Sequence, residues 1–204
     1  MYSSDYRKIA KESCKKYSNI LALIYLIIFV LLNIGGCIYF KIHKFNYEIK
    51  IDLSILFSIF LGGQFLASKT YLAKKVYLKE EIEVKDAFYG FKEYKRNLLI
   101  NLLETIYTAL WFLLLIIPGI IKMISYSMAF HVSEDNKELT PNQCITRSKE
   151  MMEGHKWQYF CLMFSYIGWI LLSVLTLGVL LLWVEPKMEQ AKYEFYLRIS
   201  GQIE

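Results

Sequence analysis

Polar side chains recur at helical spacing inside one of the most apolar stretches of the chain. They are Asn97, Asn101, Glu104, Thr105 and Thr108. At 3.6 residues per turn, these five positions fall within about a third of the circumference of a helix. Glu104 lies eight residues beyond Arg96, which in a helix is about 12 Å from that basic edge. An ionisable residue at such depth in a membrane costs a few kcal/mol unless a partner stabilises it.

His131 is the partner that the spacing predicts for Glu104. If the chain reverses at Pro118 and Gly119, an antiparallel hairpin places Glu104 about 21 Å and His131 about 18 Å from the turn. One interpretation is an ion pair or hydrogen bond that only fixes the hairpin. The other is a polar lining for a cavity that handles protons or a ligand headgroup. The sequence leaves both open.

No motif of a soluble enzyme accompanies this stripe. The chain has three histidines, and it lacks HExxH, G-x-S-x-G and a P-loop. Its four cysteines form no C-x-x-C pair, so we expect neither a disulfide framework nor a zinc site. We therefore expect no catalytic residue, no metal, no cofactor and no nucleic-acid partner.

A second basic site lies at Gly154-His155-Lys156. The tripeptide resembles a copper-binding sequence, but that chemistry needs a free amino terminus and these residues lie in mid-chain. We interpret His155 and Lys156 as a basic junction at the membrane surface that contacts anionic lipid headgroups.

The elements that carry these residues are membrane helices. The chain has 204 residues, of which 55% are hydrophobic, above the usual 45–50% of soluble domains. Uncharged runs extend from Ile20 to Phe40, from Leu53 to Ser68 and from Trp157 to Val184, and a weakly polar one from Leu98 to Ile117. About 20 apolar residues cross a bilayer. The composition predicts an all-α, polytopic membrane bundle and leaves almost nothing for a soluble domain.

Three short amphipathic segments resemble one another, and each precedes an apolar run. They are Ala10-x-x-x-Cys14-Lys15-Lys16-Tyr17, Ala87-x-x-x-Phe91-Lys92-Glu93-Tyr94 and Cys144-x-x-x-Ser148-Lys149-Glu150-Met151. A repeated unit of amphipathic helix, span, turn and returning span explains them. The single membrane domain, residues 1–204, then consists of pseudo-repeats 1–78, 79–137 and 138–204. The alternative is that any interfacial helix before a span looks like this.

Turn and cap residues divide the chain further. Pro118 and Gly119 predict a turn after the third span, and Gly178 predicts one after the fifth. Thr140, Pro141 and Gln143 predict a capped helix start. The returning helices 120–132 and 179–200 are the weakest spans, since the first is short and the second is charged, with an apolar stripe at Val184, Met188, Ala191 and Phe195.

Positive charge favours six crossings, arranged as three hairpins that each follow a cytoplasmic amphipathic helix. With the amino terminus inside, 20 Lys and Arg residues lie inside and 4 outside, whereas four crossings give 16 and 8. Short loops rich in Lys and Arg remain cytoplasmic. We therefore expect both termini to be cytoplasmic.

Many short blocks in the second half resemble a known family. They are Trp111-x-x-Leu114-x-x-Ile117-Pro118-Gly119-Ile120-Ile121-Lys122, Tyr126-Ser127-Met128-Ala129, Ser148-Lys149-x-Met151-Met152-x-Gly154-His155-Lys156, Ser165-Tyr166-Ile167-Gly168-Trp169, Leu175-Thr176-Leu177-Gly178, Trp183, Pro186 and Phe195-Tyr196. The chain resembles the domain-of-unknown-function 975 family of Gram-positive bacteria, closely over residues 107–197 and loosely over its first third. It departs from the family at Lys137, Cys144 and Lys187, where Pro, Ala and Tyr are usual.

The resemblance implies a six-helix protein of the bacterial cytoplasmic membrane with no known activity. It also implies a distant likeness to the membrane domain of some bacterial glycerophosphodiester phosphodiesterases. Two function classes stay open. One is a non-enzymatic scaffold, binding or protective (immunity-like) protein that contacts the lipid bilayer, its anionic headgroups and a membrane protein or peptide partner. The other is a small transporter or lipid-handling protein, which the repeats and the polar stripe favour.

Overall fold

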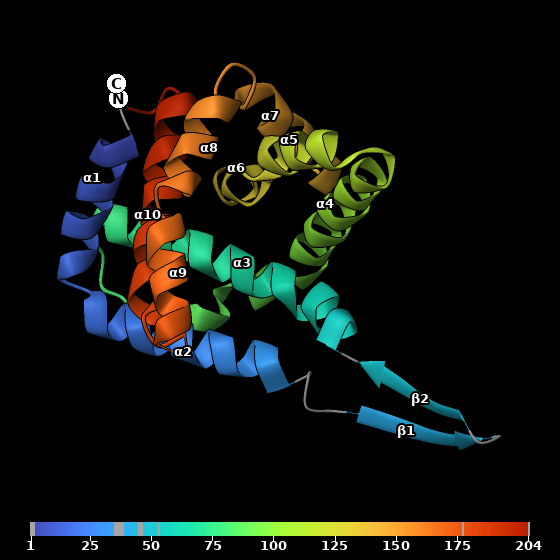
Figure 1. Cartoon of the computed structure of the whole chain (residues 1–204). Helices are drawn as coiled ribbons and strands as arrows, with labels where there is room; N and C mark the ends of the chain where they lie inside the picture. The colour runs from blue at the N-terminus through green and yellow to red at the C-terminus, as the bar shows by residue number, and fades with distance from the viewer. Residues whose placement is uncertain (1–2, 35–38, 45–46, 53, 177, 204) are drawn as a thin grey trace.

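Helices account for nearly all of the chain in the computed structural model, which describes residues 3–34, 39–44, 47–52, 54–176 and 178–203 (Figure 1). Side chains between positions 32 and 59 are not part of that description. The elements, in order, are α1 (Ser3–Lys15), α2 (Ser18–Ile34), β1 (Tyr39–Lys44), β2 (Tyr47–Asp52), α3 (Ser54–Leu78), the 3₁₀ helix η2 (Val84–Glu93), α4 (Tyr94–Leu114), α5 (Ile116–Tyr126), α6 (Ala129–Asp135), α7 (Pro141–Met151), α8 (Lys156–Phe164), α9 (Ile167–Leu175) and α10 (Leu181–Ile199).

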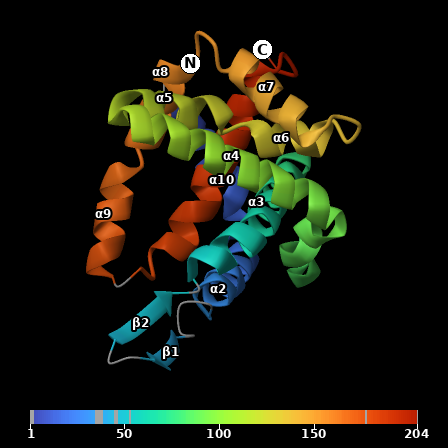
Figure 2. The ribbon, with the colours of Figure 1, turned by 90° about the vertical axis from the view of Figure 1, so that its right-hand side faces the viewer.

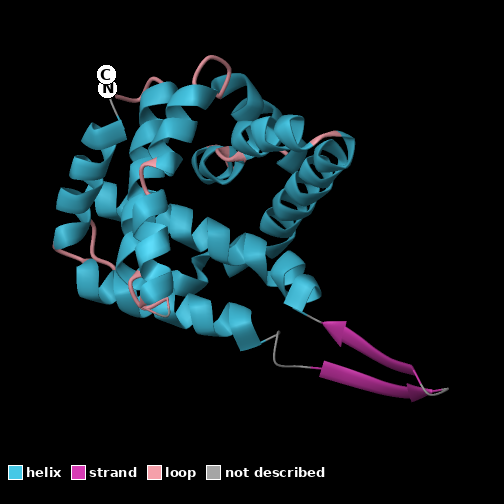
Figure 3. Cartoon of the chain, viewed as in Figure 1, coloured by secondary structure: helices cyan, strands magenta, loops and turns pink. Residues whose placement is uncertain are grey.

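The all-α expectation holds apart from one short β-hairpin. Strands β1 and β2 pair antiparallel, with Tyr39 opposite Asp52 and Lys44 opposite Tyr47 (Figure 3). This segment includes the end of the first apolar run, so α2 stops at Ile34 rather than continuing to Phe40. The Tyr39–Lys44 segment contains two aromatic residues and a β-branched one, which favours a strand.

Each predicted amphipathic segment is helical and precedes one or two apolar helices. They are α1 before α2, η2 before α4, and α7 before α8 and α9. The start predicted for α7 is confirmed, because Thr140 accepts a hydrogen bond from the Gln143 amide at 3.4 Å and the Gln143 side chain accepts one from the Thr140 amide at 2.8 Å. These reciprocal bonds satisfy two donors that would otherwise lack partners.

Two of these three amphipathic helices pack alike. Helix η2 lies against α3, and α7 lies against α5 and α6, so each contacts the helices that precede it in the chain. Helix α1 has no preceding helix, and it packs along α10 at the other end of the chain (Figure 1). The two chain ends therefore lie close together, and the first helix packs against the last.

The turn at Gly178 is confirmed, whereas the one expected at Pro118 and Gly119 lies three residues earlier. Gly178 has φ +85°, and its amide donates to the Ser173 carbonyl at 2.8 Å. The chain reverses between α4 and α5 at Leu115, which is extended with φ −161° and ψ 145°. The Pro118 ring would clash with the carbonyl of Leu114, four residues back, if α4 continued. Pro118 therefore lies in the first turn of α5, where no amide donor is needed.

Three helical segments are long and apolar enough to cross a membrane: Val84–Leu114, Ile116–Asp135 and Lys156–Leu175. A fourth is possible if α1 and α2, which meet at 97°, form one broken span. Leu113 is 85% exposed and Leu175 is 80% exposed, so the tips of these helices present apolar surface. Such a surface is suited to lipid, and it identifies a membrane protein. Figure 2 shows α4 beside α5, whereas α9 and α10 diverge from the turn that joins their lower ends.

Candidate functional site

Three buried polar residues lie on α10, one of the two helices that the sequence predicts to be the weakest spans. Glu189, Gln190 and Glu194 are all buried. The apolar stripe expected on this helix is confirmed, since Val184, Ala191 and Phe195 are buried and Met188 packs against the same cluster. Helix α10 contacts α1, α2, α3 and α9, so it lies in the centre of the bundle.

The charges at this centre are paired. The Lys192 ammonium lies 2.8 Å from the Glu189 carboxylate, one helical turn away. Lys69, on α3, lies 2.8 Å from Glu185 on α10. The Gln190 side-chain amide donates to Glu194 at 3.2 Å. Burying a charge is costly unless it is paired and hydrogen-bonded, so these contacts explain how a charged helix occupies the core.

A third ion pair connects this centre to the end of α6. Lys74 on α3 lies 2.7 Å from one oxygen of Asp135. The other oxygen accepts hydrogen bonds from the Tyr196 hydroxyl at 2.8 Å and from the Gln202 side chain at 3.2 Å. Asp135 therefore links α3, α6 and the last helix.

The polar stripe on α4 divides into two parts. Asn97 is buried, and its side-chain amide donates to the Gly90 carbonyl at 2.7 Å. Asn101 faces α3. Its side-chain nitrogen would lie 3.6 Å from a Cβ added to Gly62 on that helix. These two residues therefore fix α4 against η2 and α3. Neither residue lines the groove that the rest of the stripe forms.

The other three stripe residues line an open groove. Glu104, Thr105 and Thr108 form it with Ala109 and Phe112. One Glu104 oxygen is buried and has no hydrogen-bond partner among the described residues. The Thr105 hydroxyl donates back to the Asn101 carbonyl at 2.7 Å, which is the usual local bond of a threonine inside a helix. The groove thus combines a carboxyl group with two hydroxyls on an otherwise apolar surface.

His131 does not meet Glu104, contrary to the pairing that the spacing predicts. Its two ring nitrogens have no hydrogen-bond partner within the described chain. The ring instead packs on Tyr193 and Tyr196 of α10, with centroids 6.0 and 5.3 Å away. The prediction assumed one continuous helix after the turn, but α5 ends at Tyr126 and α6 begins at Ala129. This interruption changes which face His131 occupies.

The predicted headgroup residues lie at the start of α8. His155 precedes the helix and Lys156 is its first residue. His155 contacts Gln158 at 3.4 Å, and the neighbouring Trp157 is exposed. An exposed tryptophan beside basic residues is typical of a membrane interface. Their contact with lipid stays a prediction.

The sequence analysis did not identify the residues that form the ion pairs of α10. Glu189 and Lys192 are spaced i, i+3, which permits an ion pair on one helix. The spacing is visible in the sequence, but it is equally typical of a helix surface that faces solvent. The pair is buried because α1, α2 and α3 pack around α10.

Comparison with known proteins identifies a family and gives no activity. The family described as "Protein of unknown function (DUF975)" matches residues 1–138 and 112–202. No curated protein and no solved structure matches the chain significantly. The two matched ranges together extend over nearly the whole sequence, including all the buried polar residues of α10. The chain therefore belongs to the DUF975 family of proteins of unknown function.

Proposed function

We propose that this chain is a non-enzymatic binding or scaffolding protein of the bacterial cytoplasmic membrane, with a protective, immunity-like role included in that class. In this proposal the chain crosses the membrane six times as three hairpins. The outward helices are α2, α4 and α8 with α9, and the returning helices are α3, α5 with α6, and α10. The charge asymmetry of 20 inside against 4 outside supports cytoplasmic termini.

The observation that carries the proposal is the paired polar centre. The ammonium groups of Lys69 and Lys192 each lie 2.8 Å from a carboxylate of α10. A transport path needs polar groups that face an accessible cavity, whereas these are occupied by one another. Three cavities of the described chain, between α1 and α10, along α4, and between α5 and α8, are lined by neither Glu189 nor Lys192. A closed centre favours binding or scaffolding over transport.

Equivalent positions of the proposed repeats support the three-hairpin arrangement. Ala10, Ala87 and Cys144, the first residue of each pattern, are completely buried. The residue four positions later contacts a returning helix in all three units. These contacts are Cys14 Sγ to the Pro186 carbonyl at 3.8 Å, Phe91 on Phe65 with ring centroids 5.4 Å apart, and Ser148 Oγ to the Ser125 carbonyl at 2.8 Å.

Cysteine accessibility tests the closed centre. In a background without native cysteines, Ala191→Cys should resist a water-soluble maleimide applied to either side of membrane vesicles. Lys85→Cys, whose parent side chain is 73% exposed, is the labelled control. Reaction of Ala191→Cys from both sides would indicate an aqueous path through the bundle and would favour transport.

The groove at Glu104 favours a second candidate, a lipid-handling or transport protein. A carboxyl oxygen without a partner in the described chain is costly in a membrane, and Thr105 and Thr108 add polar groups beside it. The test is a cellular one. Glu104→Gln should fold normally and lose whatever phenotype the intact gene confers if the groove handles a proton or headgroup. Retention of that phenotype would eliminate this candidate.

A further inference from the structure

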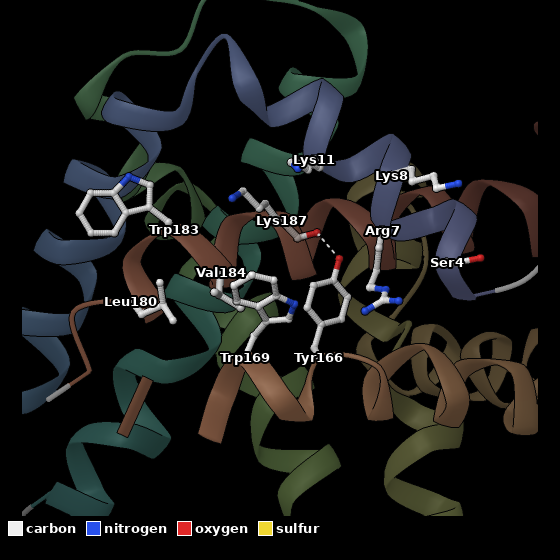
Figure 4. A pocket seen from close by; sticks show the side chains of 10 residues that line it. All are labelled: Ser4, Arg7, Lys8, Lys11, Tyr166, Trp169, Leu180, Trp183, Val184 and Lys187. Carbon is white, nitrogen blue, oxygen red and sulfur yellow. Dashed lines mark hydrogen bonds between the residues drawn. The ribbon is translucent and has the colours of Figure 1, made fainter. Parts of the chain in front are cut away.

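A cavity of about 300 Å³ lies between α1, the start of α9 and the first half of α10 (Figure 4). Arg7 and Lys11 enter it from α1, and Lys187 enters it from α10. Its other wall contains Tyr166 and Trp169. The α1 residues are more than 150 positions away in the chain from the other lining residues, so no local sequence pattern marks this cavity.

The cations of the cavity have no carboxylate partner. Arg7 donates from one terminal nitrogen to the Ser165 carbonyl at 3.1 Å, while its Nε is buried and has no partner in the described chain. Neither Lys11 nor Lys187 forms an ion pair within the described residues. No Asp or Glu lines the cavity in that part of the chain. A cavity lined by these three cations and by no carboxylate among the described residues is a site for negative charge.

The polar wall of the cavity is held in place by hydrogen bonds. The Tyr166 hydroxyl donates to the Lys187 carbonyl at 3.3 Å, and the Ser165 carbonyl holds the Arg7 guanidinium. In Figure 4, Arg7 and Trp169 lie on either side of Tyr166, while Lys8 points away at the rim. Arg7 thus has a fixed position, and its planar group suits the oxygens of a phosphate.

The remaining wall is apolar and partly exposed. Leu180, Trp183 and Val184 of the α9–α10 turn and early α10 line it together with Trp169. Both tryptophans are exposed. In Figure 4, these side chains occupy the end of the cavity opposite Arg7. A ligand that fills the cavity must therefore be anionic at one end and apolar at the other.

We propose that this cavity binds an anionic glycerophospholipid of the cytoplasmic leaflet. Its phosphate lies among Arg7, Lys11 and Lys187, and an acyl chain follows Trp169 and Trp183 toward the Gly178 turn. The inference rests on the proposed orientation, in which α1 is cytoplasmic and the Gly178 turn is on the outer side. Basic pockets between membrane helices on the cytoplasmic side are suited to phospholipid headgroups, and 300 Å³ is within the usual range of ligand cavities.

Three added ligands test the assignment on the full-length protein, delipidated in neutral detergent. They are dioleoylphosphatidylglycerol, dioleoylphosphatidylcholine with the same chains, and glycerol 3-phosphate with the same phosphate and no chain. We expect the first to raise the melting temperature and to remain bound in native mass spectrometry. An equal effect of phosphatidylcholine would overturn charge recognition. An equal effect of glycerol 3-phosphate would overturn the lipid in favour of a soluble phosphate.

The double variant Lys11→Gln/Lys187→Gln identifies the site, because neither side chain has a hydrogen bond or ion pair in the described structure. Loss of two cations should weaken the apparent affinity for phosphatidylglycerol on the order of tenfold. The matched control Lys95→Gln/Lys149→Gln removes the same charge at two exposed positions outside the cavity, and should change the affinity less than about twofold. Equal losses in both variants would mean unspecific adhesion to a basic surface and would overturn the proposal.

A second pair of variants tests the apolar half. Trp183→Ala should weaken phosphatidylglycerol binding, whereas Trp157→Ala, at an exposed position outside the cavity, should leave it unchanged. Lipid binding that survives both the charge and the Trp183 variants would place the lipid elsewhere. If Ala191→Cys still resists labelling in that case, the proposed binding or scaffolding function is unaffected. The two proposals can therefore be rejected independently.

Discussion

The thiol of Cys14 donates a hydrogen bond to the carbonyl oxygen of Pro186 at 3.8 Å, across 172 positions of sequence. It joins α1 to α10, the first described helix to the last. Pro186 lies inside α10, and Cys14 is buried at the end of α1. Through this contact, α1 packs against α10, the last helix of the chain.

Cys14 should therefore be unreactive in the folded protein. Burial raises the pKa of its thiol to about 12, so the thiolate that attacks a maleimide is scarce at pH 8. In a variant that retains only Cys14, labelling in detergent should be slow and should become fast after denaturation. Rapid labelling before denaturation would show that α1 does not pack on α10. Because the unfolded thiol ionises near pH 9, this residue stabilises the fold below that pH and progressively less as pH rises toward 12.

Gly90→Ala should destabilise the protein strongly. An added Cβ would lie 1.9 Å from the Gln64 carbonyl oxygen, so η2 and α3 would have to separate. Overpacking costs about 1–3 kcal/mol or more. Gly168→Ala is the matched control, since nothing lies within 4 Å of its added Cβ. Melting in detergent should fall for the first variant and stay the same or rise for the second. Equal melting temperatures would contradict the close approach of η2 and α3.

Lys192→Met should destabilise the centre of the bundle. The side chains of Lys192 and Glu189 are only 19% and 10% exposed, and removal of one partner leaves a carboxylate buried without its cation. Such a loss costs on the order of 3 kcal/mol. The double variant Lys192→Met/Glu189→Leu should recover much of this loss, as measured by chemical denaturation. Arg147→Ala, in an exposed pair, is the control and should change stability by less than about 1 kcal/mol.

Glu104→Leu should not destabilise the protein. In the described structure, one Glu104 oxygen is buried without a hydrogen-bond partner, so the substitution removes a costly group and leaves no other group unpaired. Glu104→Gln should melt close to the parent. A substantial loss of stability in the leucine variant, measured by thermal unfolding in detergent, would show that Glu104 has a polar partner in the membrane.

Topology can be mapped with introduced cysteines. The native Cys144 is unsuitable, since it is completely buried and receives a hydrogen bond from Arg96 at 3.6 Å. In a background without native cysteines, Lys85→Cys should react with an impermeant reagent only after permeabilisation. Glu48→Cys, on β2, should react in intact cells. The reverse pattern would contradict the proposed orientation.

Local sequence alone determined that most of the chain is helical and where several of the helices begin or end. The capping box at Thr140 and the left-handed turn at Gly178 follow from the conformational preferences of single residues. The apolar stripe of α10 follows from spacing, and the burial of Val184, Ala191 and Phe195 agrees with it. These features depend on neighbours within one or two turns, which is why the sequence was sufficient for them.

Only the tertiary structure decided which polar residues meet. The number of residues on each side of the turn predicted that His131 pairs with Glu104. The chain is interrupted between α5 and α6, and His131 packs on Tyr193 and Tyr196 instead. The basic cavity likewise joins Arg7 to Lys187, which no periodicity relates. Spacing determines which face of a helix is apolar, but not which helix covers it, because contacts between distant segments depend on how the whole bundle packs.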